Sequence, residues 1–199
     1  MMGVTHIYIG TMSAVLLTEL ESPCNCLAAM IGGSLGGIFC DLDLGNCRSE
    51  AWRARVHACL LTGFCLMIDL FFDMGLLRNM LLQNTSEQLL GTTGLLCLGC
   101  FAMTQPHRGW AHSVGAAAAA GFCAELVCPG LGFPFLAGMG SHILLDLLNR
   151  KPLQLFWPIP GGYCLGICRV GGQPDRLLWK LGVFGTVLFI GIAIGQIHG

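Results

Sequence analysis

Two polar segments interrupt an otherwise apolar sequence. One runs from Gln105 to Ser113 and the other from Gly138 to Asp146, and together they hold three of the six histidines, an arginine and an aspartate. Each lies in or beside a run of residues that is apolar enough to be embedded in a membrane. Because a polar group in that setting is costly unless it is paired, these two segments are the first candidates for a functional site.

The residue types and spacings in these segments favour a metal site. His142 and Asp146 are four residues apart, so they share one face of a helix. Imidazole and carboxylate together suit zinc, manganese or non-haem iron. His107 and His112 are five residues apart, so we expect a turn to bring both inward from the junction of two helices.

Two other parts of the chain add potential ligands. Asp41 and Asp43 end an apolar run, and His6 lies near the start of the chain. Three histidines and a carboxylate are enough for one metal ion, and four histidines with two or three carboxylates are enough for two. Asp43 is either a further ligand or a carboxylate that supports the ligands. The predicted ligands are His6, Asp41, His107, His112, His142 and Asp146.

Such a site suits the hydrolysis of a phosphoester. A bound divalent ion lowers the pKa of water to about 7 and polarises the group to be cleaved. Arg108 is placed to bind a phosphate bidentately, which arginine does better than lysine. Ser113 either orients a ligand or caps the helix that follows it. Our predicted catalytic set is therefore Arg108, Asp43 and Ser113.

The composition predicts the elements that position these side chains. Of the 199 residues, 54% are hydrophobic and 11% are charged, whereas a soluble domain has roughly 25% charged residues. The 29 glycines suit closely packed membrane helices. We therefore expect an all-α, polytopic membrane helical bundle that forms one domain over residues 1–199. The formal net charge of −1 comes without a basic stripe, so no nucleic-acid partner is expected.

We expect about seven membrane spans (six to seven). A full span needs about 20 apolar residues, so the first two are short or re-entrant. With alternating spans, nine of the ten basic residues fall on the side where the chain begins, together with the candidate ligands. The positive-inside rule makes that side cytoplasmic. The expected spans are 7–20, 27–40, 56–82, 89–104, 111–128, 131–148 and 179–197.

Three other features allow more than one interpretation. Asp69 and Asp73 stand near the middle of the third expected span, where two ionised carboxylates would be costly, so either one is neutral or both pair with a polar group. Glu125, also in an apolar run, poses a weaker form of the same problem. The aromatic loop within 149–178 either covers the site, receives a lipid or is an ordinary membrane-surface loop. Most of the twelve cysteines lie in apolar runs, so we interpret them as small buried hydrophobic residues.

The sequence resembles the YdjM-like family of bacterial inner-membrane proteins, which are predicted metal-dependent hydrolases. The resemblance covers most of the chain and departs at Cys40, where members commonly have proline before the first aspartate. The H-R-G-x-x-H-S element is its most specific part. The residues that carry it are His6, Asp41-x-Asp43, His107-Arg108-Gly109-x-x-His112-Ser113, Ser141-His142-x-x-x-Asp146 and Leu155-Phe156-Trp157-Pro158.

This family is distantly similar to zinc-dependent phospholipase C and the P1-type nucleases. That similarity implies zinc, in one to three ions, and a phosphoester substrate that is a lipid or another amphiphile. A bacterial inner-membrane location follows from the same resemblance. Two alternatives stay open: a metal-ion or proton-coupled transporter that uses the same cluster together with Asp69 and Asp73, and a protein whose metal only holds its helices together.

Overall fold

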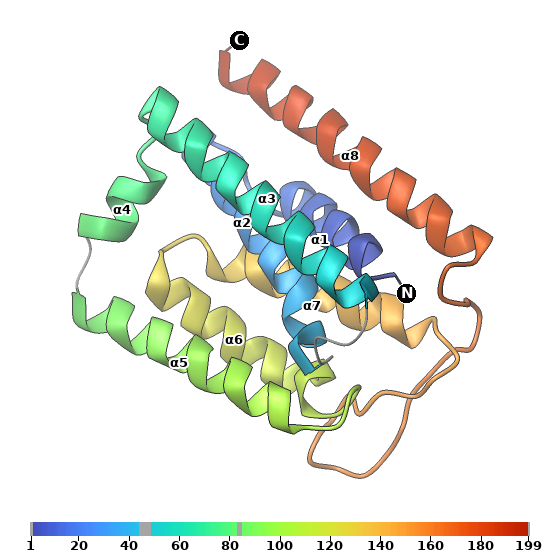
Figure 1. The fold of residues 1–199 in the computed structure, drawn as a ribbon. Coiled ribbons are helices and arrows are strands. Elements are labelled where there is room, and N and C mark those ends of the chain that lie inside the picture. Colours follow the sequence, from blue (N-terminus) through green and yellow to red (C-terminus); the bar gives the residue numbers. More distant parts are fainter. Residues whose placement is uncertain (1, 44–48, 83–84, 199) are drawn as a thin grey trace.

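The computed structural model describes residues 2–43, 49–82 and 85–198, and these form eight α-helices with two short 3-10 helices, η1 and η2 (Figure 1). Their only β-type pairings are two isolated bridges in the segment between α7 and α8. The all-α prediction is confirmed. The elements are α1 (Gly3–Leu17), α2 (Pro23–Phe39), η1 (Cys40–Asp43), α3 (Ser49–Phe72), α4 (Leu76–Leu82), α5 (Thr85–Thr104), η2 (Trp110–His112), α6 (Val114–Val127), α7 (Gly132–Leu147) and α8 (Gln173–His198).

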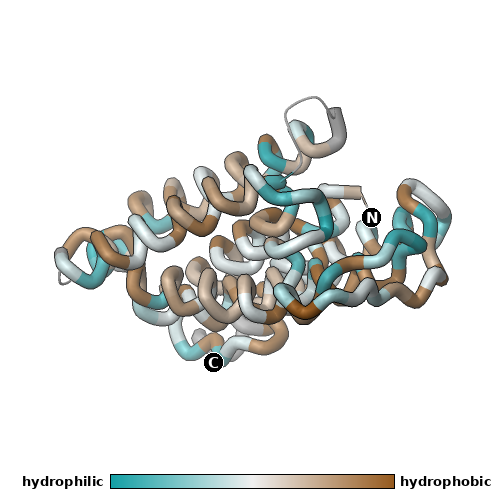
Figure 2. The backbone as a smooth tube through the Cα atoms, turned by 90° about the horizontal axis from the view of Figure 1, so that it is seen from below, coloured by the Kyte–Doolittle hydropathy of each residue, from teal (hydrophilic) through white to brown (hydrophobic). Residues whose placement is uncertain are grey.

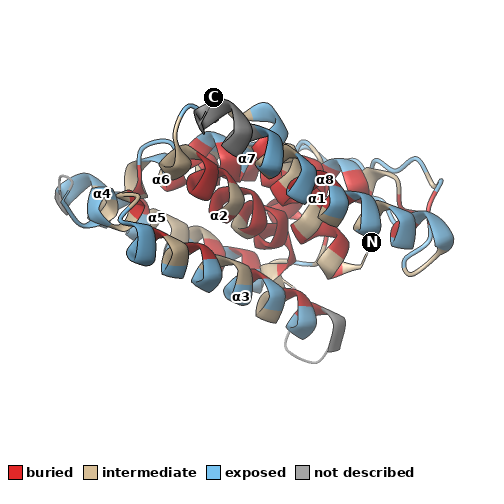
Figure 3. Cartoon of the chain, turned by 90° about the horizontal axis from the view of Figure 1, so that it is seen from above, coloured by how far each residue is buried: buried red, intermediate tan, exposed pale blue. Residues whose placement is uncertain are grey.

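Helices α1, α2 and α7 form the buried centre of the molecule (Figure 3). Glycines let their backbones touch. A Cβ atom at Gly36 would collide with the carbonyl of Phe135, and one at Gly138 would collide with the backbone of Gly33. This backbone contact is the close packing that small residues permit between helices.

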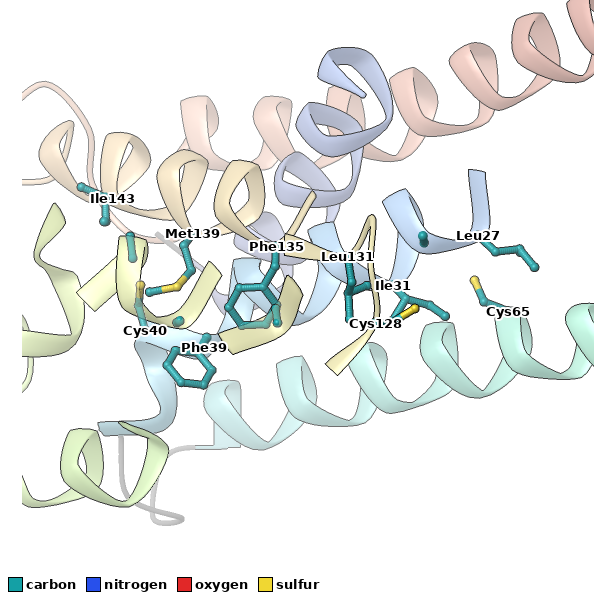
Figure 4. Close-up of a cluster of buried hydrophobic side chains, with 14 of the residues drawn as sticks. Leu27, Ile31, Phe39, Cys40, Cys65, Cys128, Leu131, Phe135, Met139 and Ile143 are labelled. Carbon is teal, nitrogen blue, oxygen red and sulfur yellow. The ribbon is translucent and has the colours of Figure 1, made fainter. Parts of the chain in front are cut away.

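An apolar core fills the space between the central helices and α6 (Figure 4). Phe39 from α2 and Phe135 from α7 meet edge to face, with ring centroids 5.4 Å apart. By contrast, the outer faces of α3, α5 and α8 expose large apolar side chains, among them Phe71, Leu90 and Phe184. Apolar residues recur along the helices of the chain (Figure 2). An apolar surface of this extent marks a contact with a membrane or a partner.

Two helical segments are long and apolar enough to cross a membrane, Pro23–Asp43 and Ala51–Phe72. Helices α1 and α6 are apolar but shorter. The seven expected spans correspond in order to α1, α2, α3, α5, α6, α7 and α8. A seven-span membrane bundle nevertheless stays a prediction.

The expected span 56–82 is wrong in its second half. Helix α3 ends at Phe72, and a turn with Asp73 at φ 48° and Gly75 at φ 92° leads into the short α4. The glycine suits this left-handed backbone because it has no Cβ atom. The chain therefore changes direction where the sequence suggested an unbroken helix.

The carboxylates expected in the middle of that span lie at helix ends. The side chain of Asp69 accepts hydrogen bonds from the backbone N–H groups of Leu76 and Leu77, both at 2.8 Å, which caps α4. Asp73 forms an exposed ion pair with Arg78. The placement near mid-span was wrong, because α3 ends at Phe72. Of the two interpretations, pairing with a polar group describes both carboxylates, although the exposed Asp73 does not face inward.

The side chain of Glu125 accepts hydrogen bonds at the start of a helix. Its two carboxylate oxygens accept hydrogen bonds from the N–H groups of Gly130 (3.0 Å) and Gly132 (2.9 Å), where α7 begins. These N–H groups have no partner within the helix, so a carboxylate here is favourable.

The cysteine prediction is only partly confirmed. Cys40, Cys65 and Cys128 are buried, as expected of small hydrophobic residues. Cys97 and Cys100 are exposed on α5, so these two cysteines of an apolar run do not fit the prediction. They lie on one of the outward apolar faces described above.

Candidate metal centre

The predicted ligands come from five separate parts of the chain and meet at one end of the helical assembly. The first turns of α1, the end of α2 with η1, the turn after α5, η2 and the last turns of α7 converge there, at the end away from α4 (Figure 1).

The ligand atoms form three overlapping groups, and within each group they lie within 4.8 Å of one another. All the members are buried except His107, which is partly exposed. The side chain of His107 therefore marks the side from which solvent reaches the cluster. The groups are His6 with Asp41 and His142, Asp41 with His107 and His112, and His112 with His142 and Asp146.

Several imidazole nitrogens in the cluster are buried without a hydrogen-bond partner among the described residues. They are Nδ1 of His6, both ring nitrogens of His112 and Nε2 of His142. A buried polar atom left unsatisfied costs about 1–3 kcal/mol. A divalent metal ion would satisfy such atoms, so these residues fit a metal centre.

The orientation of His142 leaves one nitrogen available. Its Nδ1 lies 2.7 Å from the backbone carbonyl oxygen of Gly37 on α2. Because a carbonyl oxygen can only accept, Nδ1 carries the proton and Nε2 keeps its lone pair. A second hydrogen bond of this kind fixes the tautomer of metal-binding histidines in general.

The two aspartates among the predicted ligands lie between histidines of different elements. Asp146 has one oxygen 3.5 Å from Nε2 of His6 and the other 3.6 Å from Nε2 of His112. Asp41 has an oxygen 3.7 Å from Nε2 of His142 and belongs to two of the three groups. Each carboxylate would therefore be available, with these histidines, to hold a divalent ion.

Asp43 lies behind the ligands and is absent from the three groups. Its Oδ1 accepts a hydrogen bond from Nδ1 of His107 at 2.8 Å, which leaves Nε2 of that ring for the cluster. Its Oδ2 accepts from the backbone N–H of Arg108 at 3.3 Å and lies 3.7 Å from Nδ1 of His112. Of the two roles considered for Asp43, the geometry favours the carboxylate that supports the ligands.

Arg108 is buried beside the ligands in a left-handed backbone conformation (φ 70°). Its guanidinium lies 3.1 Å from Oδ2 of Asp146 and also donates to the carbonyl oxygen of Lys151. The arginine therefore stands next to the cluster, as a phosphate-binding role requires. In this structure its charge is paired with Asp146.

Ser113 serves as the N-terminal cap of α6. Its Oγ accepts a hydrogen bond from the N–H of Ala116 at 3.1 Å. This interaction satisfies a helix N–H group that would otherwise lack a partner. Of the two roles considered for Ser113, the structure shows the cap; the catalytic one stays a prediction.

The environment of His112 favours a neutral ring. This residue lies in η2, before α6 begins. Its side chain is fully buried. An imidazolium there would lose its hydration, whereas the neutral imidazole is the form that binds metal.

Sequence reasoning missed a buried aspartate that holds α1 in place. Asp175, in the first turn of α8, accepts hydrogen bonds from Oγ1 of Thr5 (2.7 Å) and from the N–H groups of Met2 (2.9 Å) and Gly171 (2.7 Å). Thr5 directly precedes His6. The available signal was an aspartate at a helix start, which is typical of a cap and gives no hint of a partner 170 residues away.

A second missed residue is Asn149, whose side-chain amide donates to Oδ1 of Asp146 at 2.7 Å. It is fully within the protein, with 2% of its surface exposed. Its spacing of three residues from a predicted ligand at the end of a helix was the signal that could have found it. Asn149 thereby connects the metal centre to the segment that follows α7.

The family model described as "YdjM inner membrane protein" matches residues 1–197, so the chain belongs to this family. This confirms the resemblance found in the sequence and supports a membrane location. No curated protein and no solved structure matches the chain. The expected distant similarity to zinc-dependent phospholipase C and P1-type nucleases is not shown by these comparisons.

Proposed function

We propose that this member of the YdjM inner membrane protein family is a metal-dependent hydrolase of the bacterial inner membrane. Its substrate would be a phosphoester of a lipid or another amphiphile, cleaved at the cytoplasmic interface. The multi-pass topology and the cytoplasmic position of the site belong to this proposal. They rest on the distribution of basic residues along the expected spans.

One observation carries the proposal: four histidines and two aspartates from distant parts of the chain form three overlapping groups of ligand atoms, and several of their buried nitrogens lack partners among the described residues. A packing network of polar side chains would normally satisfy these atoms. Buried imidazole nitrogens without a hydrogen-bond partner are typical of metal ligands. Zinc is the metal that this histidine-rich set suits best, with manganese or iron also possible.

Each residue has a role that its contacts support. A bound divalent ion supplies a Lewis acid and an acidified water. Asp43 orients His107 and His112 from behind. Arg108 stands within reach of both Asp146 and an incoming phosphate, so it would exchange its ion pair for the substrate. The partly exposed His107 marks the entry side.

The local partners of Asp69 and Asp73 favour hydrolysis over transport. A transporter using this cluster would need polar groups that continue across the third span, and these two carboxylates were the candidates. One caps α4 and the other pairs with Arg78. Neither is therefore free to relay an ion from the cluster.

The test is a hydrolysis assay with the full-length protein in nanodiscs. Release of a phosphorylated headgroup from phospholipid is measured with zinc or manganese present and after chelation. We expect activity in wild type and in His57→Ala, whose histidine contacts Tyr8 outside the cluster, and none in His142→Ala or after chelation. Activity that survives both treatments, or a metal-loaded wild type inactive on every phosphoester tried, would contradict the proposal.

A further inference from the structure

The segment between α7 and α8 has a fixed base that is attached to the metal centre. The N–H of Gln154 donates to the carbonyl of Arg108 at 3.0 Å, and the carbonyl of Leu155 accepts from the N–H of Val114, also at 3.0 Å. Two hydrogen bonds of 3.0 Å pair Leu153 with Tyr163. The base is thus held by the arginine of the site and by the start of α6.

The far side of the same segment is also fixed. The N–H of Leu165 donates to the carbonyl of Leu147 at 2.6 Å, and the N–H of Cys168 donates to that of Leu148 at 2.8 Å. Cys168 is buried against the end of α7. The chain from 150 to 170, which we term the interfacial loop, is therefore an ordered projection at the site end of the molecule (Figure 1).

The interfacial loop turns large apolar side chains away from the protein. Each has between 46% and 69% of its surface exposed. The rings of Phe156 and Tyr163 stand edge to face, with centroids 5.6 Å apart, on this exposed side. Such a surface is unfavourable in water and suits the headgroup region of a bilayer, where aromatic rings gather. The side chains are Phe156, Ile159, Tyr163, Leu165, Ile167 and Val170.

The charges of the loop have one sign. Arg150, Lys151 and Arg169 are exposed, and residues 149–172 contain no aspartate or glutamate. A cationic segment beside a membrane surface is attracted to anionic lipids. The apolar side chains of the loop suit the bilayer interior near the headgroups, and its basic side chains suit the negative charge of an anionic phospholipid.

We propose that the interfacial loop inserts its apolar side chains into the headgroup region of the bilayer and binds anionic phospholipid there through Arg150, Lys151 and Arg169. The outer faces of several helices are also apolar, and the chain belongs to a membrane protein family. The cationic loop begins beside the arginine of the site, because the guanidinium of Arg108 donates to the backbone carbonyl of Lys151.

The second part of the inference rests on the proposed function: it names an anionic phospholipid as the substrate class presented to the metal centre. The path from loop to site consists of three contacts. Lys151 and Gln154 contact Arg108, and Asn149 contacts Asp146. Insertion of the loop into the membrane would therefore hold Arg108 and Asp146 in position beside the cluster.

The experiment measures tryptophan emission from the full-length protein in nanodiscs. The double variant Trp52→Phe/Trp179→Phe keeps Trp157 in the loop and the buried Trp110. Quenching is recorded with lipids brominated at shallow or deep chain positions and with aqueous iodide. The same protein carrying Trp157→Phe supplies the signal of Trp110 alone, which is subtracted.

We expect shallow brominated lipid to quench Trp157 at least twofold more than deep brominated lipid, with little quenching by iodide. Iodide quenching like that of a free tryptophan, without an effect of brominated lipid, would overturn the insertion. Changing from zwitterionic to partly anionic lipid should further shield Trp157 from iodide, and the triple variant Arg150→Gln/Lys151→Gln/Arg169→Gln should lose this response. Equal shielding in both lipids would overturn anionic phospholipid as the occupant.

None of these readouts needs catalysis or a bound metal. A protein without metal whose Trp157 lies in the bilayer would contradict the proposed function and leave the interfacial loop standing. A metal-loaded hydrolase whose Trp157 stays in water would support the proposed function and contradict the insertion of the interfacial loop. The two proposals can therefore fail separately.

Discussion

Nδ1 of His142 on α7 donates a hydrogen bond to the backbone carbonyl of Gly37 on α2, at 2.7 Å. The contact joins the two central helices at the point where the metal centre begins. It also sets which nitrogen of His142 faces the cluster. Helix packing and ligand orientation therefore depend on the same pair of residues.

Substitution of Gly37 by alanine tests this dependence. A Cβ atom at Gly37 would stand 2.6 Å from the carbonyl oxygen of His6, so α1 would have to move away from α2. We expect a loss of about 1–3 kcal/mol in the free energy of unfolding, as in other overpacked cores, and weaker metal binding. Thermal unfolding and metal titration of the purified variant measure both effects.

The matched control is Gly63→Ala on α3, where no atom of the described residues lies within 4 Å of the added Cβ atom. Alanine in a helix interior is favoured over glycine by about 0.5–1 kcal/mol. The control should therefore be as stable as wild type or more so. Equal stability of the two variants would show that the contact between α1 and α2 is less tight than described.

Asp43→Asn should weaken metal binding while the fold remains. The amide cannot accept hydrogen bonds with both of its side-chain atoms, so His107 and the N–H of Arg108 are no longer both held. Substitution of such supporting groups typically costs 10–100-fold in metal affinity. Competition with a chelator gives the affinity, and Asp73→Asn, at an exposed ion pair far from the cluster, should leave it unchanged.

The contact between Thr5 and Asp175 should control the position of His6. Thr5→Val keeps the shape of the side chain but removes the hydroxyl that donates to Asp175, leaving a buried carboxylate with one bond fewer. We expect lower stability by about 1–3 kcal/mol and a several-fold loss of metal affinity. Thr5→Ser restores the hydroxyl and should recover both. A serine variant no better than valine would show that methyl packing, and not the hydrogen bond, is what matters.

The variant Asp69→Asn distinguishes two possible roles of this carboxylate, capping of α4 and transfer of an ion. Loss of a cap typically costs about 0.5–2 kcal/mol, so the variant should unfold at a lower temperature because the N–H groups of Leu76 and Leu77 lose a charged acceptor. Metal binding should not change. Loss of metal-ion or proton flux in proteoliposomes, with unchanged stability, would instead favour the transporter alternative.

The helical class and the ligand set could be predicted from the sequence because each leaves a local signal. Apolar runs indicate helices, and histidine or aspartate within such a run stands out. All six predicted ligands fall in the three groups of nearby atoms. Their convergence followed from counting alternating helices, which needs only the order of the segments.

What the sequence did not show was either a weak local signal or a contact between distant residues. The break after Phe72 arises from a turn whose signal, Asp73 followed by Gly75, was hidden in an apolar stretch. The pairing of Asp175 with Thr5 joins the two ends of the chain and has no local pattern. The supporting role of Asp43 also required the positions of His107 and Arg108 in space.

The most direct test is the metal content of the purified, detergent-solubilised protein. Wild type is compared with His112→Ala, His142→Ala and the control His57→Ala by elemental analysis, and circular dichroism confirms that each is folded. We predict one or more equivalents of zinc, manganese or iron in wild type and in the control, and its loss in the two cluster variants. A wild type that holds no metal even after reconstitution would contradict the metal centre and with it the proposed hydrolase.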